Sequence, residues 1–289
     1  SNGSAKSTAG ALNYSDFAKA SGKSIAQSGD IVAQVADGIS NSSRINSEFF
    51  ATIRKSFGDF KVEALLGTSF REDNTKNINV SSNNLAFPTL FNIIGRKGEP
   101  GASESTLKSR LARYFGKVSI GYNNWAFLEG TASYDINSRL AYFWDFDFNA
   151  TNFFYPGVSA SVILSEAIPA LKNSKTVSYL KLRGAISKTG NVNLGVQSLE
   201  NTYGLGGGFP YGSLVGYTSG NVLRLPRYTP EFVKNNEIGF ELGLLKNRIS
   251  IEGTYYTQDN TDQIVQVAYS GATGFTSALL NAASFTNKG

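Results

Sequence analysis

Chemically reactive side chains are scarce in this sequence of 289 residues, which contains no cysteine and no histidine. Thiolate nucleophiles, disulfide bonds and histidine general bases or metal ligands are therefore excluded. Two carboxylates lie close together at Asp145 and Asp147 and could contact a cation or a glycan. We favour a simpler interpretation, in which Trp144–Phe148 is an aromatic-rich strand end. We expect no enzyme, no catalytic residue and no cofactor.

Two further clusters could hold a ligand. The glycine-rich segment 204–212 suggests a phosphate-binding loop, but it lacks the strand–glycine–helix context and the Lys-Ser/Thr pair of that motif. We interpret it as the tip of an extracellular loop. Asp259, Asn260 and Asp262 suggest a calcium loop, but no glutamate stands at its twelfth position. We interpret this segment as a solvated loop and expect no metal site.

The composition limits the classes of protein that remain. Hydrophobic residues make up 41% and charged residues 17% of the chain, which is not a disordered composition. No stretch approaches the ~20 apolar residues that a membrane-spanning helix needs. The net charge is +5, but Lys and Arg are scattered without a run of five. Nucleic-acid binding, which needs a basic stripe, is therefore not expected.

Alternation of apolar and polar residues is the dominant pattern and predicts β-strands. In segment 60–71, Phe60, Leu66 and Phe70 share one face, whereas Lys61 and Arg71 share the other. The expected strands are mostly about 10 to 14 residues long, against a usual length near 5–6. We expect about nine strands and the beginning of another, at 31–40, 44–57, 60–72, 109–122, 125–136, 154–164, 179–188, 233–245, 248–258 and 281–289.

Short and long connections alternate between these strands. The short ones are Gly58-Asp59, Asn123-Asn124, Lys246-Asn247 and the modest segment 165–178, and the long ones are 73–108, 137–153, 189–232 and 259–280. Outer-membrane β-barrels have short periplasmic turns, long extracellular loops and strands of about ten residues. The sequence therefore predicts an all-β fold: a transmembrane antiparallel β-barrel, present in part and belonging to a larger barrel.

The alternation also assigns the two faces of the barrel wall. Val118, Leu182 and Phe240 are expected to face lipid, with Lys117, Arg183 and Glu241 as neighbours that face the lumen. The inward basic residues Arg113, Lys117, Lys181 and Arg183 could favour anions. Polar side chains must line any wide barrel, however, so we favour a generic polar wall.

Five segments, taken in order, resemble the SusC/RagA-type TonB-dependent transporters of the Bacteroidetes outer membrane. The family has an LKLR strand followed by a TGN turn, an RL-x-x-YFG-x-V hairpin and a segment ending in NKG. The similar segments here are SRLARYFGKVSIGYNNWAFLEGTASYDINSRL (109–140), FYPGVSASVILSE (154–166), SYLKLRGAISKTGNVNLG (178–195), EIGFELGLLKNRISIEGTYYTQDNTDQIV (237–265) and ATGFTSALLNAASFTNKG (272–289).

Some features depart from the family pattern. Tyr155-Pro156-Gly157 stands where the family has FPS, and the family's tryptophan is replaced around Val162. The family's carboxypeptidase-like domain, TonB box, plug domain and closing C-terminal strands have no counterpart in this sequence. We therefore expect residues 1–289 to form part of the transmembrane barrel of a transporter of ~22 strands.

The resemblance implies TonB-dependent active import of nutrients, such as glycans, oligosaccharides or peptides, across the bacterial outer membrane. It implies a SusD-like surface lipoprotein as partner, TonB acting through a plug and TonB box outside this chain, and contact with outer-membrane lipid. Substrate-binding residues stay unassigned. A passive or structural outer-membrane barrel, such as a porin-like channel or an assembly partner, is the alternative; a soluble β-rich surface binder is a third.

The alternation of connections predicts their sidedness. Loops 73–108, 137–153 and 189–232 should face the outside, whereas Gly58-Asp59, Asn123-Asn124 and Lys246-Asn247 should face the periplasm. Single cysteine substitutions in the parent protein, labelled on intact cells with an impermeant reagent, will test this. We expect labelling at Gly207 and protection at Asn123; the reverse result would overturn the topology.

Overall fold

The structure, a computed structural model, describes residues 2–9, 33–82, 84–87, 89–142, 151–205, 214 and 216–289. These residues form β-strands connected by turns and short helical segments. The elements are β1 (Asn2–Ala9), β2 (Gln34–Phe57), β3 (Phe60–Ser82), η1 (Ile93–Gly95), β4 (Gly101–Tyr122), β5 (Ala126–Asn137), η2 (Ser138–Leu140), β6 (Asn152–Ile163), α3 (Leu164–Ala167), α4 (Pro169–Lys172), β7 (Val177–Asn191), β8 (Tyr203–Leu205), β9 (Tyr217–Ser219), β10 (Val222–Leu223), β11 (Glu231–Leu244), β12 (Ile249–Ala268), η3 (Gly271–Thr273) and β13 (Ser277–Lys288).

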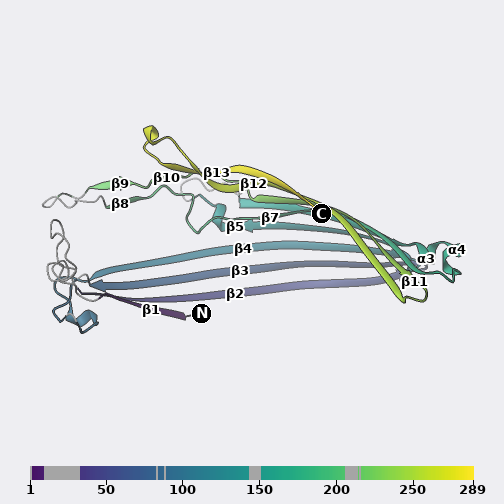
Figure 1. Cartoon of the computed structure of the whole chain (residues 1–289), viewed down its shortest axis with the longest axis horizontal. Helices are drawn as coiled ribbons and strands as arrows, with labels where there is room; N and C mark the ends of the chain where they lie inside the picture. Colours follow the sequence, from purple (N-terminus) through teal and green to yellow (C-terminus); the bar gives the residue numbers. More distant parts are fainter. Residues whose placement is uncertain are drawn as a thin grey trace, which may run out of the picture. The chain divides into compact units, whose positions relative to one another are not determined.

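The long strands belong to one sheet in the order β1-β2-β3-β4-β5-β6-β7-β11-β12-β13-β10, while β8 and β9 form a separate ribbon (Figure 1). The registers from β4 to β7 and from β7 through β11 and β12 to β13 are antiparallel, and only the two-residue β10 pairs in parallel. None of the described helices has the length and apolarity to cross a membrane. The expected all-β fold with a large antiparallel sheet is confirmed.

The chain divides into two compact units. The first comprises Ser1–Ile45 and Glu72–Lys108, and the second Asn46–Arg71 and Ser109–Gly289. In the first unit, Val35 and Leu85 are buried together, because the connection after β3 folds back and packs Phe91 and Ile93 against them. The second unit contains β5 to β13 and the parts of β2, β3 and β4 nearest to their short turns.

The sheet of the second unit leaves one apolar face open. Val118, Leu182 and Phe240 are 46%, 47% and 40% exposed, and Phe240 lies directly opposite Leu182 in the register of β11 and β7. Large aliphatic side chains in a water-soluble sheet would be covered by a second layer. The exposed apolar face is instead the face that a membrane barrel turns to lipid.

Tight turns join the strands at the positions that the sequence indicated. Asn123 and Asn124 have φ values of 46° and 61°, and Leu245, Lys246 and Asn247 have values of 52°, 59° and 58°. Asparagine and glycine tolerate this left-handed backbone because a short or absent side chain avoids the carbonyl clash. The turn between β2 and β3 places Gly58 at φ 57° for the same reason. These turns fix the register of three hairpins.

Three strands are longer than expected. Segments 31–40 and 44–57 were expected as two strands, but residues 34–57 form the single strand β2. Strand β3 continues to Ser82 and β4 begins at Gly101. The connection expected at 73–108 therefore spans only 83–100. In β3 the residues that follow Phe70 are mostly polar on both faces, so the alternation of apolar and polar residues that predicts a strand fades there. Ion pairs between neighbouring strands hold them there, including Glu72–Lys108 at 2.9 Å and Lys76–Glu104 at 3.0 Å.

The prediction of a long loop at 259–280 was also wrong, because β12 runs to Ala268 and β13 begins at Ser277. The register shifts between Asn260 and Ile264, where Asp262 has φ 57°. The buried Glu231 carboxylate accepts a hydrogen bond from the Ile264 N–H at 2.9 Å and so satisfies the backbone of this bulge. Extra residues in a bulge interrupt the alternation, which explains the missed strand.

The connection from β7 to β11 contributes to a small hydrophobic core that the sequence analysis did not predict. Its buried residues are Leu140, Val192, Leu194, Leu199, Tyr228 and Ile264. The Tyr228 hydroxyl donates to the Leu279 carbonyl oxygen at 2.8 Å and accepts from the Leu225 N–H at 2.9 Å. Burial raises the pKa of Tyr228, so the hydroxyl keeps its donor proton at neutral pH. The described part of this connection is therefore anchored to β13.

An arginine at Val118, Leu182 or Phe240 should cost roughly 2–4 kcal/mol of unfolding free energy, because it would place a charge in the apolar band of the bilayer. Unfolding of the parent barrel in lipid vesicles measures this. Glutamine at the neighbouring Lys117 is the control and should cost about 0.5 kcal/mol or less unless its acidic partners are left unpaired.

A lipid-dissolved spin probe distinguishes a lipid-facing apolar face from one that is buried in the core of a soluble protein. Labels at Val118 and Leu182 should be quenched from the bilayer, and a label at Lys117 should be quenched from water. Protection of Val118 and Leu182 from both phases would contradict a membrane barrel.

Candidate functional site on the polar face of the sheet

The polar face of the sheet brings together the four basic residues that the sequence singled out. Arg113 and Lys117 lie on β4, and Lys181 and Arg183 on β7. Arg113 and Lys117 are four residues apart and Lys181 and Arg183 are two apart, so each pair shares one face of its strand. All four contact carboxylates on neighbouring strands. The lumen-facing assignment by alternation therefore agrees with the contacts, and the basic residues are paired with acids.

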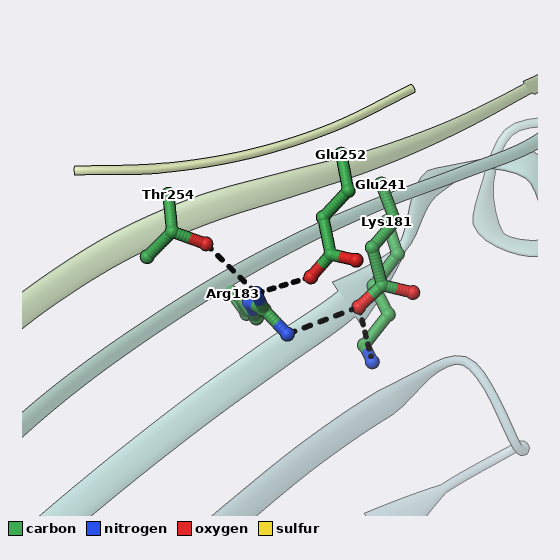
Figure 2. A network of polar contacts seen from close by, with 5 residues as sticks. All are labelled: Lys181, Arg183, Glu241, Glu252 and Thr254. Atoms are coloured by element: carbon green, nitrogen blue, oxygen red, sulfur yellow. Dashed lines mark hydrogen bonds and ion pairs between the residues drawn. The ribbon is translucent and has the colours of Figure 1, made fainter. Parts of the chain in front are cut away.

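A network of five residues ties β7, β11 and β12 together (Figure 2). The Lys181 Nζ lies 3.1 Å from Glu241 Oε1, and Arg183 Nη1 lies 3.3 Å from the same oxygen. The other end of the guanidinium reaches β12, where Nη2 is 2.6 Å from Glu252 Oε1 and donates to Thr254 Oγ1 at 2.8 Å. One arginine thus bonds acceptors on two strands.

The register explains why this arginine is needed. Glu241 lies directly opposite Glu252, and like charges in that position destabilise a sheet. Arg183 neutralises the pair by crossing over Gly239, its partner in the register. A Cβ at Gly239 would lie 2.9 Å from Arg183 Nε and 3.1 Å from the Gly253 carbonyl oxygen. The absent side chain leaves the passage through which the guanidinium reaches β12.

A second network ties β2, β3, β4 and β5. Glu63 Oε2 accepts from Arg54 Nε at 2.5 Å, and Lys117 Nζ lies 3.5 Å from Glu63 and 3.6 Å from Glu129. The Ser119 hydroxyl donates to Glu129 at 2.8 Å. Positive and negative groups balance within both networks. The contacts therefore favour the generic polar wall over an anion-selective lumen, and both networks serve as ties between strands.

A groove of about 630 Å³ lies on the same face and is lined by residues of β2 to β7. Arg113, Phe115, Ser133, Tyr155 and Thr189 are among its lining residues. Sequence reasoning assigned no site role to Tyr155 or to Asp135, the partner of Arg113. The sequence did not identify Asp135: a two-residue turn at Asn123-Asn124 would place Tyr134 opposite Arg113, whereas the observed turn spans residues 123–125 and places Asp135 there. The role of Tyr155 depends on the β6 register, which no tight turn fixes.

The other candidate clusters do not form a site. Asp259 and Asn260 lie within β12, where Asp259 accepts from the Thr286 hydroxyl at 2.7 Å. In the part of the chain that the structure describes, no three acidic side chains are grouped so as to hold a metal ion. Asp145, Asp147 and most of the glycine-rich segment 204–212 lie outside the described residues.

Comparisons of the sequence and of the structure with known proteins agree on one class of protein. No protein-family model matches the chain. The chain is 28% identical over 186 residues to the TonB-dependent receptor P26 of Formosa agariphila, covering 62% of this chain and 18% of that protein.

Among the solved structures with a similar fold are those of a peptide transporter and a siderophore receptor. The RagAB peptide transporter matches with a TM-score of 0.68 at 19% identity over 89% of this chain and 27% of the other. The siderophore receptor PirA from Acinetobacter baumannii matches with a TM-score of 0.50 at 16% identity over 93% of this chain and 35% of the other. The chain therefore spans about a fifth to a third of the proteins that it resembles.

A large antiparallel sheet with one open apolar face, one self-paired polar face and tight turns between its strands defines the class of outer-membrane β-barrels. Within this class, the chain is similar in sequence to part of a TonB-dependent receptor and similar in fold to part of the RagAB peptide transporter. Outer-membrane localisation follows from the class.

Glutamine at Glu241 should destabilise the parent barrel more than glutamine at Glu252. Glu241 holds two cations and its side chain is 28% exposed, whereas Glu252 holds one and is 60% exposed. We expect a loss of about 1 kcal/mol for Glu241→Gln and about 0.5 kcal/mol or less for Glu252→Gln. Unfolding in lipid vesicles at low and high salt measures both. Equal losses would contradict the assigned roles.

Proposed function

We propose that residues 1–289 form part of the transmembrane barrel of a protein that actively imports nutrients across the outer membrane. The plug domain, TonB box and closing strands of that protein would lie in segments outside this sequence. The carrying observation is the combination of a two-faced barrel sheet with five family-like segments in order. Similarity to a TonB-dependent receptor supports energy coupling through TonB.

The proposed cargo is a glycan, oligosaccharide or peptide, delivered by a SusD-like surface lipoprotein. The peptide cargo named for RagAB and the resemblance to the SusC/RagA family support this substrate range. Transport needs no covalent chemistry, and a wall of paired charges and hydroxyls suits non-covalent passage of a polar solute. We therefore propose a transporter without enzymatic activity.

Uptake in cells tests the energy coupling. Deletion of the parent gene should abolish growth on its nutrient, and loss of TonB or addition of a protonophore should reduce uptake to the level of the deletion strain. A porin-like channel would continue to admit solute without TonB, so uptake that survives both treatments would refute active import. Purification of the tagged parent protein should recover a SusD-like lipoprotein.

A further inference from the structure

The groove on the polar face contains an arginine that is held by a buried acid. Asp135 is 4% exposed, and its two carboxylate oxygens accept from Arg113 Nε at 2.7 Å and Nη2 at 2.6 Å. Ser133 donates to Asp135 at 3.2 Å and further fixes the carboxylate. A buried carboxylate is stable only when it is paired and hydrogen-bonded, so Asp135 restricts the position of the guanidinium.

The pair leaves part of the guanidinium free for a ligand. An arginine has five N–H donors, and Asp135 engages two of them. The Arg113 side chain is 44% exposed and lines the groove, whereas the side chain of Asp135 is buried and does not line it. The planar fork of a guanidinium matches the two oxygens of a carboxylate. Arg113 is therefore oriented to bind one carboxylate from the groove.

The rest of the groove suits an uncharged chain. Hydroxyl groups of Ser69, Ser133, Ser187 and Thr189 line it beside the rings of Phe115 and Tyr155. The charges of the lining nearly balance: Lys117 contacts Glu63 and Glu129, and the lining holds one acidic residue, Glu48, beside the further basic residue Lys188. Lys188 is also held over the Phe232 ring, at 3.7 Å from its centre. This balance disfavours a polyanion and fits a ligand with a single carboxylate.

We propose that this groove is a binding site for the carboxylate end of a largely uncharged oligomer. The inference rests on the proposed import function and adds a ligand chemistry to it. Residues of β2, β3 and β4 build the groove together with residues of β5, β6 and β7; those on β6 and β7 lie near the strand ends at which the long connections attach. Two ligands share this chemistry: a peptide with a free C-terminal carboxylate, and an oligosaccharide with one sugar-acid residue.

The intact parent transporter, purified in detergent, provides the test by equilibrium dialysis with two matched ligand pairs. One pair is tetra-alanine and its C-terminal amide; the other is a neutral trisaccharide ending in one glucuronate and its methyl ester. We expect at least one free acid to bind about tenfold more tightly than its neutral partner, as charge-assisted hydrogen bonds allow. The pair that shows the preference identifies the ligand source.

Variants assign the preference to the groove. Arg113→Gln should remove the difference between acid and neutral partner. Arg54→Gln should keep it, because Arg54 is paired with Glu63 on the same face but lies outside the groove. Heat-modifiable mobility in gels confirms that each barrel is folded. If Arg113→Gln does not fold, Arg113→Lys decides, since it retains the charge but loses the fork and should weaken acid binding about threefold or more.

Three results would overturn the proposal: no acid preference in either pair, a preference unchanged in the folded Arg113 variant, or an equal loss in Arg54→Gln. Failure of the import function gives a different signature. In that case uptake in cells would persist without TonB. The acid preference is measured on the purified protein, so its presence or absence does not depend on that result.

Discussion

Backbone hydrogen bonding within the sheet is the constraint on which the rest of the structure depends. Lipid offers no partner to an N–H or carbonyl group, so every strand of a membrane wall must pair along its length. Pairing in turn requires a register, and the left-handed residues of the tight turns fix it in three hairpins. A shift of one residue would move Val118 to the polar face and Lys117 to the apolar face. The side-chain contacts are consequences of that register.

The same register brings carboxylates into unfavourable positions, and neighbouring side chains must compensate for their charge. It sets Glu241 against Glu252, and it buries Asp135 beside β4. In both cases an arginine from a neighbouring strand supplies the countercharge, and in the first case the gap at Gly239 admits it. A lone buried carboxylate would be destabilising, and a paired one ties two strands. The polar face is thus a set of cross-strand ties in which most charges are already satisfied.

The amino-acid sequence predicts the parts of this fold where one side of a strand is apolar and the other polar. Strands around Val118 and Leu182 and the turn at Asn123 were predictable for this reason. The outer part of β3 was not, because Glu72, Asp73 and Asn74 make both faces polar and the pairing depends on ions from another strand. The bulge near Asp262 was hidden because an extra residue breaks the alternation. The partner of Arg113 was not predictable, because the turn after β4 holds three residues, and the expected two-residue turn would have placed Tyr134 opposite Arg113 in place of Asp135.

A wall of satisfied charges has a consequence for transport. A solute that meets balanced pairs finds no strong site, so it can pass without being trapped, whereas unpaired charges would bind ions and retain polar cargo. Selectivity then has to come from a few groups that are oriented yet incompletely bonded. Arg113 meets this condition because Asp135 fixes the guanidinium while occupying two of its five donors. Arg183 differs because its guanidinium bonds Glu241, Glu252 and Thr254 on two strands and so ties β11 to β12, whereas Arg113 bonds a single carboxylate and lines a groove.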